Sequence, residues 1–323
     1  IGYQALYGST TAANNIGIQN TALGAFSLFS SSGGGQNTAL GAEALYANTT
    51  GTHNTAIGVD ALHSNISGIR NIAIGSSTLW FNTTGNYNAA LGYQALYSNT
   101  VGTENTALGY SALLSNVGRE GSTAVGYGAM RNAYNDATPG VVSFNTAVGA
   151  YSLYGSATVA SNSGLYNTAV GYSALQFVSS GNGNTAFGMR ALRYNAAKSD
   201  STAIGRGAME YADDSTTTAS TNNTAVGAYA LQGSITPSAN TGTHNTAIGW
   251  GALRDTTTGA GNNAFGYGTL TSNTTGSGNT AMGHSALLSS NIATNNTAFG
   301  YAALSTTVVK RESTAIGFNA MRY

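Results

Sequence analysis

Hydrophobic and polar positions recur along this chain at a nearly fixed interval. Most copies of the pattern read Asn-Thr-Ala, then an apolar residue, then Gly, and this glycine is numbered here as position 0. Seven successive glycines, from Gly24 to Gly126, follow one another at a constant interval of seventeen, and later intervals are 17, 22 or 23. Counting from Gly2 to Gly317 gives eighteen copies. Because so short a repeat buries its apolar side chains only by stacking on its neighbours, the pattern predicts a solenoid.

The columns of the repeat predict which residues build the interior. Position −2 is Ala in all seventeen copies that contain it, position −1 is always apolar, and position +4 is always Leu or Met. We interpret this recurrence as core and backbone packing, because repetition within one chain reports architecture before chemistry. The structural ladder is expected to include Asn37, Thr38, Ala39, Gly41, Leu45, Asn54, Ala56, Gly58, Leu62, Asn105, Ala107 and Gly109.

Short strands explain the apolar segments better than helices do. Each segment has only eight or nine residues with a glycine at its centre, whereas the helical repeats need about 33 residues. The sequence therefore predicts an all-β fold, a parallel β-solenoid or β-roll of 17-residue coils, some of them longer (22–23). Each coil is expected to hold two strands of about four or five residues, joined at the glycine and followed by a turn such as 98–102.

One polar column suggests how the coils hold together. Position −4 is Asn in fourteen of seventeen copies, and Thr follows it in fourteen. In stacked coils these Asn side chains lie over one another, where each amide can donate and accept hydrogen bonds along the stack. We expect the Asn column to act as a polar ladder.

The small core predicts association between chains. One Leu and one further apolar residue per coil are little for a lone chain to bury, and the Ala and Gly columns suit a close approach of backbones. We expect several copies to share a core, packed or intertwined as a homo-oligomeric fibre, with a trimer as the preferred state.

The register is unbroken from Gly2 to Gly317, so we expect one repetitive segment, 1–323, without a separate domain boundary. Both ends lie inside a repeat, which predicts a fragment of a longer chain. Charged motifs at 119–122, 198–201 and 310–313 mark three copies, and long repeats follow the first two. The extra residues of long repeats are expected to bulge outward and make contacts. Candidate contact residues are Tyr134, Asn135, Tyr154, Asp213, Asp214 and Thr236.

The composition of the chain limits the kinds of partner that can be expected. Only 7% of residues are charged and the formal net charge is zero, so neither nucleic-acid binding nor electrostatic membrane binding is expected. No run of 18 apolar residues occurs, which argues against membrane insertion. The 19 tyrosines are expected to pack between coils or to stack on sugars.

No pattern of reactive residues indicates an enzyme. The eleven carboxylates occupy no single common column, and the adjacent pair Asp213 and Asp214 is interpreted as a solvated loop tip. His53, His63, His244 and His284 lack metal-ligand spacing, which favours structural or solvent-exposed roles. Cysteine is absent. We therefore expect no catalytic, cofactor or metal site.

The string from Asn88 to Gly102 nearly spells Asn-Thr-Ala-Ile-Gly-Tyr-Gln-Ala-Leu-Tyr-Ser-Asn-Thr-Thr-Gly. It resembles the repeats that precede a self-cleaving intramolecular chaperone in phage tail-fibre-like proteins. Its core is also similar to the Ser-Val-Ala-Ile-Gly motif of trimeric autotransporter adhesin heads, which are left-handed parallel β-rolls in homotrimers. The resemblance implies an extracellular fibre, on a cell surface or as a virion appendage, that attaches to a cell, host or surface through a glycan or protein receptor.

Two other functions stay open. An ice- or crystal-binding solenoid would use the Thr column as an array of hydroxyl groups. A solenoid polysaccharide lyase or depolymerase would need acidic side chains clustered on one face.

Overall fold

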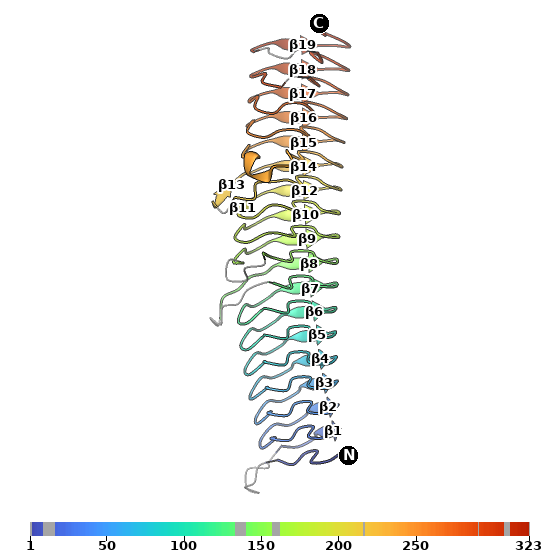
Figure 1. Cartoon of the computed structure of the whole chain (residues 1–323), viewed down its shortest axis with the longest axis vertical. Coiled ribbons are helices and arrows are strands. Elements are labelled where there is room, and N and C mark those ends of the chain that lie inside the picture. Colours follow the sequence, from blue (N-terminus) through green and yellow to red (C-terminus); the bar gives the residue numbers. More distant parts are fainter. Residues whose placement is uncertain are drawn as a thin grey trace. The chain divides into compact units, whose positions relative to one another are not determined.

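The computed structural model describes residues 2–8, 17–132, 140–156, 162–215, 217–289, 291–306 and 311–322. They belong to two compact units, Ile1–Ser163 (unit 1) and Gly164–Tyr323 (unit 2). Within each unit the coils follow one another, and each contributes a short strand to a parallel sheet (Figure 1). The prediction of an all-β parallel solenoid is confirmed, and the prediction of one continuous segment across both units stays a prediction.

The strands of the main sheet have three residues each. In the described part of unit 1 they are β1 (Thr21–Leu23), β2 (Thr38–Leu40), β3 (Thr55–Ile57), β4 (Ile72–Ile74), β5 (Ala89–Leu91), β6 (Thr106–Leu108), β7 (Thr123–Val125) and β8 (Thr146–Val148). In the described part of unit 2 they are β9 (Thr168–Val170), β10 (Thr185–Phe187), β12 (Thr202–Ile204), β14 (Thr224–Val226), β15 (Thr246–Ile248), β16 (Asn263–Phe265), β17 (Thr280–Met282), β18 (Thr297–Phe299) and β19 (Thr314–Ile316).

The described part of unit 2 has three further short elements. They are β11 (Lys198–Ser199), β13 (Ala219–Ser220) and the 3-10 helix η3 (Pro237–Ala239). Strands β11 and β13 pair with each other in parallel and lie apart from the column of three-residue strands (Figure 1). Among the described residues, no helix has the length and apolar character needed to cross a membrane.

Stacking is in register, so that equal positions of successive repeats face one another. Between β2 and β3, for example, Ala39 lies opposite Ala56 and Leu40 lies opposite Ile57. The central Ala of each strand points inward, because side chains of a strand alternate between its two faces. Ala39 and Ala56 are accordingly buried. The Thr before Ala and the apolar residue after it point outward.

The second strand expected after each glycine is not formed in the described coils, and this prediction was wrong. The segment turns instead, with positions +2 and +4 in the left-handed region, as at Gln94 (φ 55°) and Leu96 (φ 51°). The N–H of Gln94 donates to the carbonyl of Ser76 in the preceding coil, and the N–H of Leu96 donates to the carbonyl of Ala112 in the following coil. Because neighbouring coils supply partners for the backbone groups, this backbone is held despite its unfavourable φ angles.

Position 0 requires glycine for two reasons. Gly58 has φ 132°, and a Cβ atom placed there would lie 2.6 Å from the carbonyl oxygen of Gly75 in the next coil. The first feature disfavours any L side chain, and the second leaves no space for one. Gly41 (φ 142°) and Gly109 (φ 137°) adopt the same conformation.

The interior is narrow and is filled by one chain. Leu45 and Leu62, at position +4, are completely buried. From Ala39 to Ala315, the Ala column at position −2 is also buried within the single chain, so these side chains need no second copy for their burial. Small residues are needed there because the coil is too narrow for larger ones.

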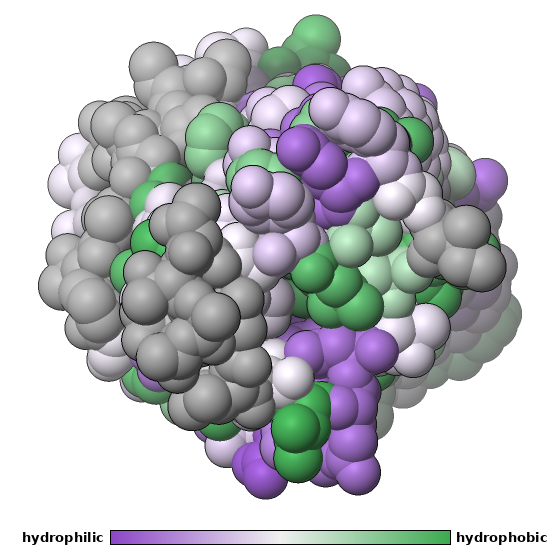
Figure 2. Space-filling model, turned by 90° about the horizontal axis from the view of Figure 1, so that it is seen from below, coloured by the Kyte–Doolittle hydropathy of each residue, from purple (hydrophilic) through white to green (hydrophobic). Residues whose placement is uncertain are grey.

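The end of unit 1 differs from its middle. Leu6 occupies position +4 in the first described coil and is 45% exposed, whereas Leu45 and Leu62 at the same position are completely buried. Seen along the stack from this end, hydrophobic residues lie at the surface beside hydrophilic ones (Figure 2).

Candidate functional site

The Asn column at position −4 forms a buried ladder that links side chains to backbones. The Oδ1 atom of Asn54 accepts a hydrogen bond from the N–H of Asn71 in the next coil, at 2.9 Å. Its Nδ2 donates to the carbonyl of Gly68 at 2.8 Å, and its own N–H donates to Oδ1 of Asn37. Asn105 repeats the pattern with Ser122 and Arg119. The expected amide-to-amide bonds occur in this column, as from Nδ2 of Asn88 to Oδ1 of Asn71 at 3.2 Å, and bonds between amides and backbone groups add to them.

A second Asn ladder, at position +7, was missed in the sequence analysis. The Nδ2 of Asn65 donates to Oδ1 of Asn48 at 2.7 Å, and that of Asn82 donates to Oδ1 of Asn65 at 2.8 Å. All three side chains are buried. The signal was present in the sequence as Asn before Thr-Thr-Gly, but turn chemistry explained it equally well.

Aromatic rings stack along the coils of each unit. In unit 1, successive contacts join Tyr7, Phe29, Tyr46, His63, Trp80 and Tyr97, with ring centroids 5.0 to 5.6 Å apart. In unit 2, Tyr229, Trp250, Tyr267, His284, Tyr301 and Phe318 form a similar series. Most neighbouring rings are stacked, which covers their faces, whereas Trp80–Tyr97 and Tyr229–Trp250 meet edge to face. Packing between coils is therefore the better interpretation of these aromatic side chains, since a sugar stacks on a ring face.

The outward residues at position −1 form what we call the apolar stripe. In unit 1 they are Leu23, Leu40, Ile57, Ile74, Leu91, Leu108, Val125 and Val148, and in unit 2 Val170, Phe187, Ile204, Val226, Ile248, Phe265, Met282, Phe299 and Ile316. Leu91 and Leu108 are 47% and 42% exposed. With Ile72 and Ile74 they line an apolar groove over β4, β5 and β6. Contiguous apolar surface of this kind marks interaction sites.

The charged motifs before the long repeats have a structural role. Lys198 lies in β11, and its Nζ is 3.2 Å from Oδ2 of Asp213 and 2.8 Å from the carbonyl oxygen of Thr217. Both charged side chains are buried. In unit 1, the Oε1 atom of Glu120 accepts a hydrogen bond from the N–H of Gly140 at 3.0 Å. These side chains fasten the extra residues of the following repeat to the coil.

The candidate contact residues differ in their exposure. Asp213 is buried and paired, so the interpretation of Asp213 and Asp214 as a solvated loop tip was wrong for Asp213, while Asp214 is exposed. Tyr154 is half-buried and accepts a hydrogen bond from Arg131 at 3.1 Å. Thr236 is exposed beside Ile235, whose side chain is 81% exposed. Tyr134 and Asn135 lie outside the described residues.

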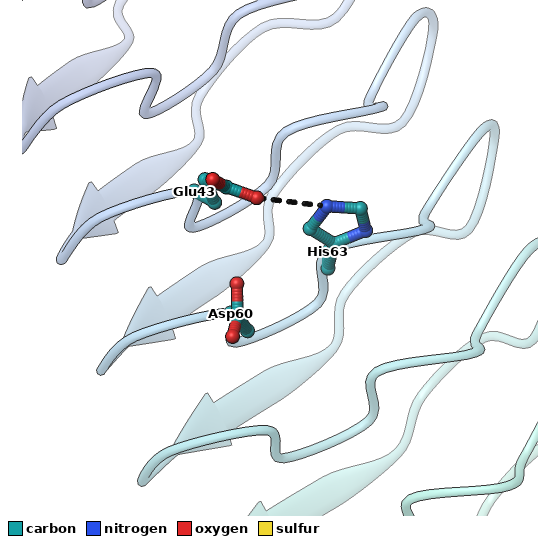
Figure 3. Close-up of side chains that lie close together, drawn as sticks. All are labelled: Glu43, Asp60 and His63. Carbon is teal, nitrogen blue, oxygen red and sulfur yellow. Dashed lines mark ion pairs between the residues drawn. The ribbon is translucent and has the colours of Figure 1, made fainter.

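One cluster of titratable side chains was missed in the sequence analysis. Glu43 and Asp60 both occupy position +2, in adjacent coils, and His63 follows Asp60 by three residues (Figure 3). The three side chains can place one ligand atom each within 4.8 Å of the others. Nε2 of His63 is 3.3 Å from Oε2 of Glu43. Comparing adjacent repeats pair by pair, instead of seeking one column for all carboxylates, would have found this cluster.

The surroundings of Asp60 in this cluster change its ionisation. The pKa of the Asp60 carboxyl is raised, first because burial disfavours its charged form and second because the charge of Glu43 is close. His63 acts in the opposite direction and lowers the pKa of Asp60.

No protein-family model, curated protein or solved structure matches this chain. The geometry of the described residues therefore carries the functional conclusion.

Proposed function

We propose that this chain is a non-enzymatic segment of an extracellular structural or adhesive fibre that attaches to a cell, host or other surface. Several copies pack side by side along their strand faces, and the long repeats supply the contacts with the surface. The observation that carries this proposal is the apolar stripe, which runs along the outward face of the stacked strands in each unit.

A second copy of this chain is the partner that fits the stripe best. The stripe repeats once per coil, so two parallel copies in register present matching apolar residues at every coil. The chain has eleven basic and eleven acidic residues and no net charge, so no long-range repulsion opposes their approach. Three copies around a common axis would cover the stripe of each copy and close the assembly.

The ladders suit a stiff shaft. Asn54 and its equivalents satisfy backbone groups of the next coil, so each coil is held by buried hydrogen bonds as well as by the sheet. A stack held in this way is stiff along its length although its hydrophobic core is small. Attachment then falls to exposed residues of the long repeats, of which Ile235 and Thr236 are the best candidates in the described part of unit 2.

Sedimentation equilibrium tests the assembly. The purified chain is expected to sediment as a multiple of 32.6 kDa, with three copies as the expected number. The double variant Leu91→Lys and Leu108→Lys places charges in the stripe and is expected to sediment at the mass of one chain with an unchanged circular dichroism spectrum. A wild-type mass equal to that of one chain at micromolar concentration would refute the packing of copies.

Attachment is tested with substitutions that spare the buried residues. Deleting whole long repeats would also remove the Lys198–Asp213 pair, so the test replaces Ile235 by Ser and Thr236 by Ala instead. This variant is expected to bind more weakly to a cell or surface that the wild-type protein binds. The control Ser67→Ala, which lies in a regular coil, is expected to bind as the wild type does. Equal binding by the wild type, the variant and the control would remove the long repeat that contains Ile235 and Thr236 from the proposal.

Ice or crystal binding is the second candidate, because the exposed Thr residues of the strands, such as Thr38, form a row beside the apolar stripe. The stripe mixes Leu, Ile, Val, Phe and Met, whose unequal sizes fit a regular lattice poorly. Thermal hysteresis of the soluble chain would favour this candidate. Cleavage of a polysaccharide, abolished by Glu43→Gln or Asp60→Asn, would instead favour the lyase or depolymerase.

A further inference from the structure

We propose that Glu43, Asp60 and His63 form a binding site for a divalent first-row transition-metal cation, with Zn²⁺ as the representative ion. The site lies on unit 1 and is independent of the proposed packing of copies.

The repeat itself brings the three side chains together. Glu43 and Asp60 occupy the same position in successive coils, and in-register parallel stacking sets such positions about 4.8 Å apart. Position +5 of the second coil adds His63, whose Nε2 lies 3.3 Å from Oε2 of Glu43. Figure 3 shows the side chain of Glu43 directed at the imidazole, with Asp60 on the same side of the coil as His63.

The imidazole is held in place before any ion binds. The ring of His63 stacks on Tyr46 at 5.0 Å with an interplanar angle of 7°, and Trp80 lies on its other side at 5.5 Å. Its Nδ1 is 3.4 Å from the hydroxyl of Ser64. This arrangement leaves Nε2 as the atom that faces the carboxylates. A ligating histidine typically has its other ring nitrogen hydrogen-bonded in this way.

The ligand set favours a transition metal over a hard cation. An imidazole suits zinc, copper, iron or nickel, whereas magnesium and calcium sites are built from oxygen atoms. A four-coordinate zinc with bonds of about 2.0–2.1 Å separates its ligand atoms by about 3.3 Å. The Glu43 to His63 distance already has this value, and the side chain of Asp60 needs only a small movement, because all ligand atoms lie within 4.8 Å. Water completes the coordination, since all three residues are partly exposed.

A bound cation would also relieve a conflict in the cluster. The ligand atoms of Glu43 and Asp60 lie within 4.8 Å of each other, and two carboxylates this close repel each other. A divalent ion balances both charges and joins two adjacent coils through their side chains. The alternative is a simple ion pair between a protonated His63 and Glu43, which requires no metal. The experiment below distinguishes this ion pair from a metal site.

His284 provides a matched control within the same chain. Its ring also stacks between two aromatic rings, Tyr267 at 4.9 Å and Tyr301 at 5.1 Å, and its Nδ1 is 2.9 Å from the hydroxyl of the next residue, Ser285. Within the described residues, His284 belongs to no group that could hold a metal ion. It reproduces the setting of His63 without the two carboxylates.

The test is isothermal titration of the metal-free 323-residue chain with Zn²⁺ at pH 7.5. We expect one saturable site per chain in the wild type and in His284→Gln. His63→Gln and Glu43→Gln are expected to bind more than about tenfold more weakly, because even changes outside the direct ligands cost about 10–100-fold. As a second readout, Cu²⁺ should quench Trp80 fluorescence in a Trp250→Phe background at one equivalent, and His63→Gln should abolish this quenching.

Three results would overturn the proposal. They are no saturable binding, equal affinity in His63→Gln and wild type, or equal loss in His284→Gln and His63→Gln. If His63→Gln alters the circular dichroism spectrum, Glu43→Gln and Asp60→Asn decide the question, and unchanged zinc affinity in both would leave only the ion pair.

Discussion

Replacing Asn54 by Ala removes one rung of the buried Asn ladder and should destabilise the coil that follows. In the wild type the amide of Asn54 accepts from the N–H of Asn71 at 2.9 Å and donates to the carbonyl of Gly68 at 2.8 Å. Asn54 and Asn71 are completely inaccessible to solvent. The alanine variant therefore leaves the buried N–H of Asn71 without a partner, whereas the carbonyl of Gly68 keeps its hydrogen bond from Nδ2 of Asn65 at 3.1 Å.

The size of the effect follows from these two groups. A buried N–H without a partner costs about 1–3 kcal/mol and the lost hydrogen bond to Gly68 about 0.5–1.5 kcal/mol, so the variant should lose about 1.5–4.5 kcal/mol in the free energy of unfolding. In a stack of repeats such a loss is felt first locally, because each coil contacts only its neighbours. The amide of Asn71 should therefore exchange with solvent faster than in the wild type.

Urea unfolding gives the change in free energy, and hydrogen exchange followed by mass spectrometry locates it. Ser67→Ala is the control, because Ser67 is exposed in the same turn that contains Gly68, and it should change stability by no more than about 0.5 kcal/mol. If Asn54→Ala also changes stability by less than about 0.5 kcal/mol, with normal protection at residues 55–71, the ladder does not hold the coils together.

Two further substitutions test other parts of the stack. Gly58→Ala should cost at least about 1–3 kcal/mol from its backbone conformation alone, and more from the clash with Gly75, whereas a thermal unfolding midpoint equal to that of the wild type would contradict the close approach. Lys198→Met should destabilise unit 2 by about 3–5 kcal/mol, because it leaves the buried Asp213 carboxylate without its partner. Adding Asp213→Leu should recover most of that loss in urea unfolding, and no recovery would mean that the pair is not coupled.

The repeat made the fold class predictable, because a glycine at the same position of every short repeat and a constant Ala two positions earlier admit few architectures. The second strand was not predictable in the same way. The apolar segment after the glycine has the length of a short strand, but the backbone at Gln94 and Leu96 is left-handed. The residue types at these positions do not predict a left-handed backbone, because hydrogen bonds to the neighbouring coils maintain this conformation.

The candidate sites were predicted less well, for a related reason. Asp213 was predicted to be exposed because two adjacent aspartates usually are. In the structure the folded loop places its carboxylate beside Lys198, a contact that the sequence does not indicate. Glu43 and Asp60 belong to different repeats, so they become neighbours only through the register of the coils. The buried Ala column shows the opposite error, since one chain provides the close packing for which a second chain was invoked.

The most direct test of the central claim is a cryo-EM reconstruction of the assembled protein. The proposed fibre predicts parallel copies in register, with the apolar stripe, including Leu40, Leu91 and Leu108, buried between them. A reconstruction of single copies, or of an assembly in which these side chains face solvent, would contradict it.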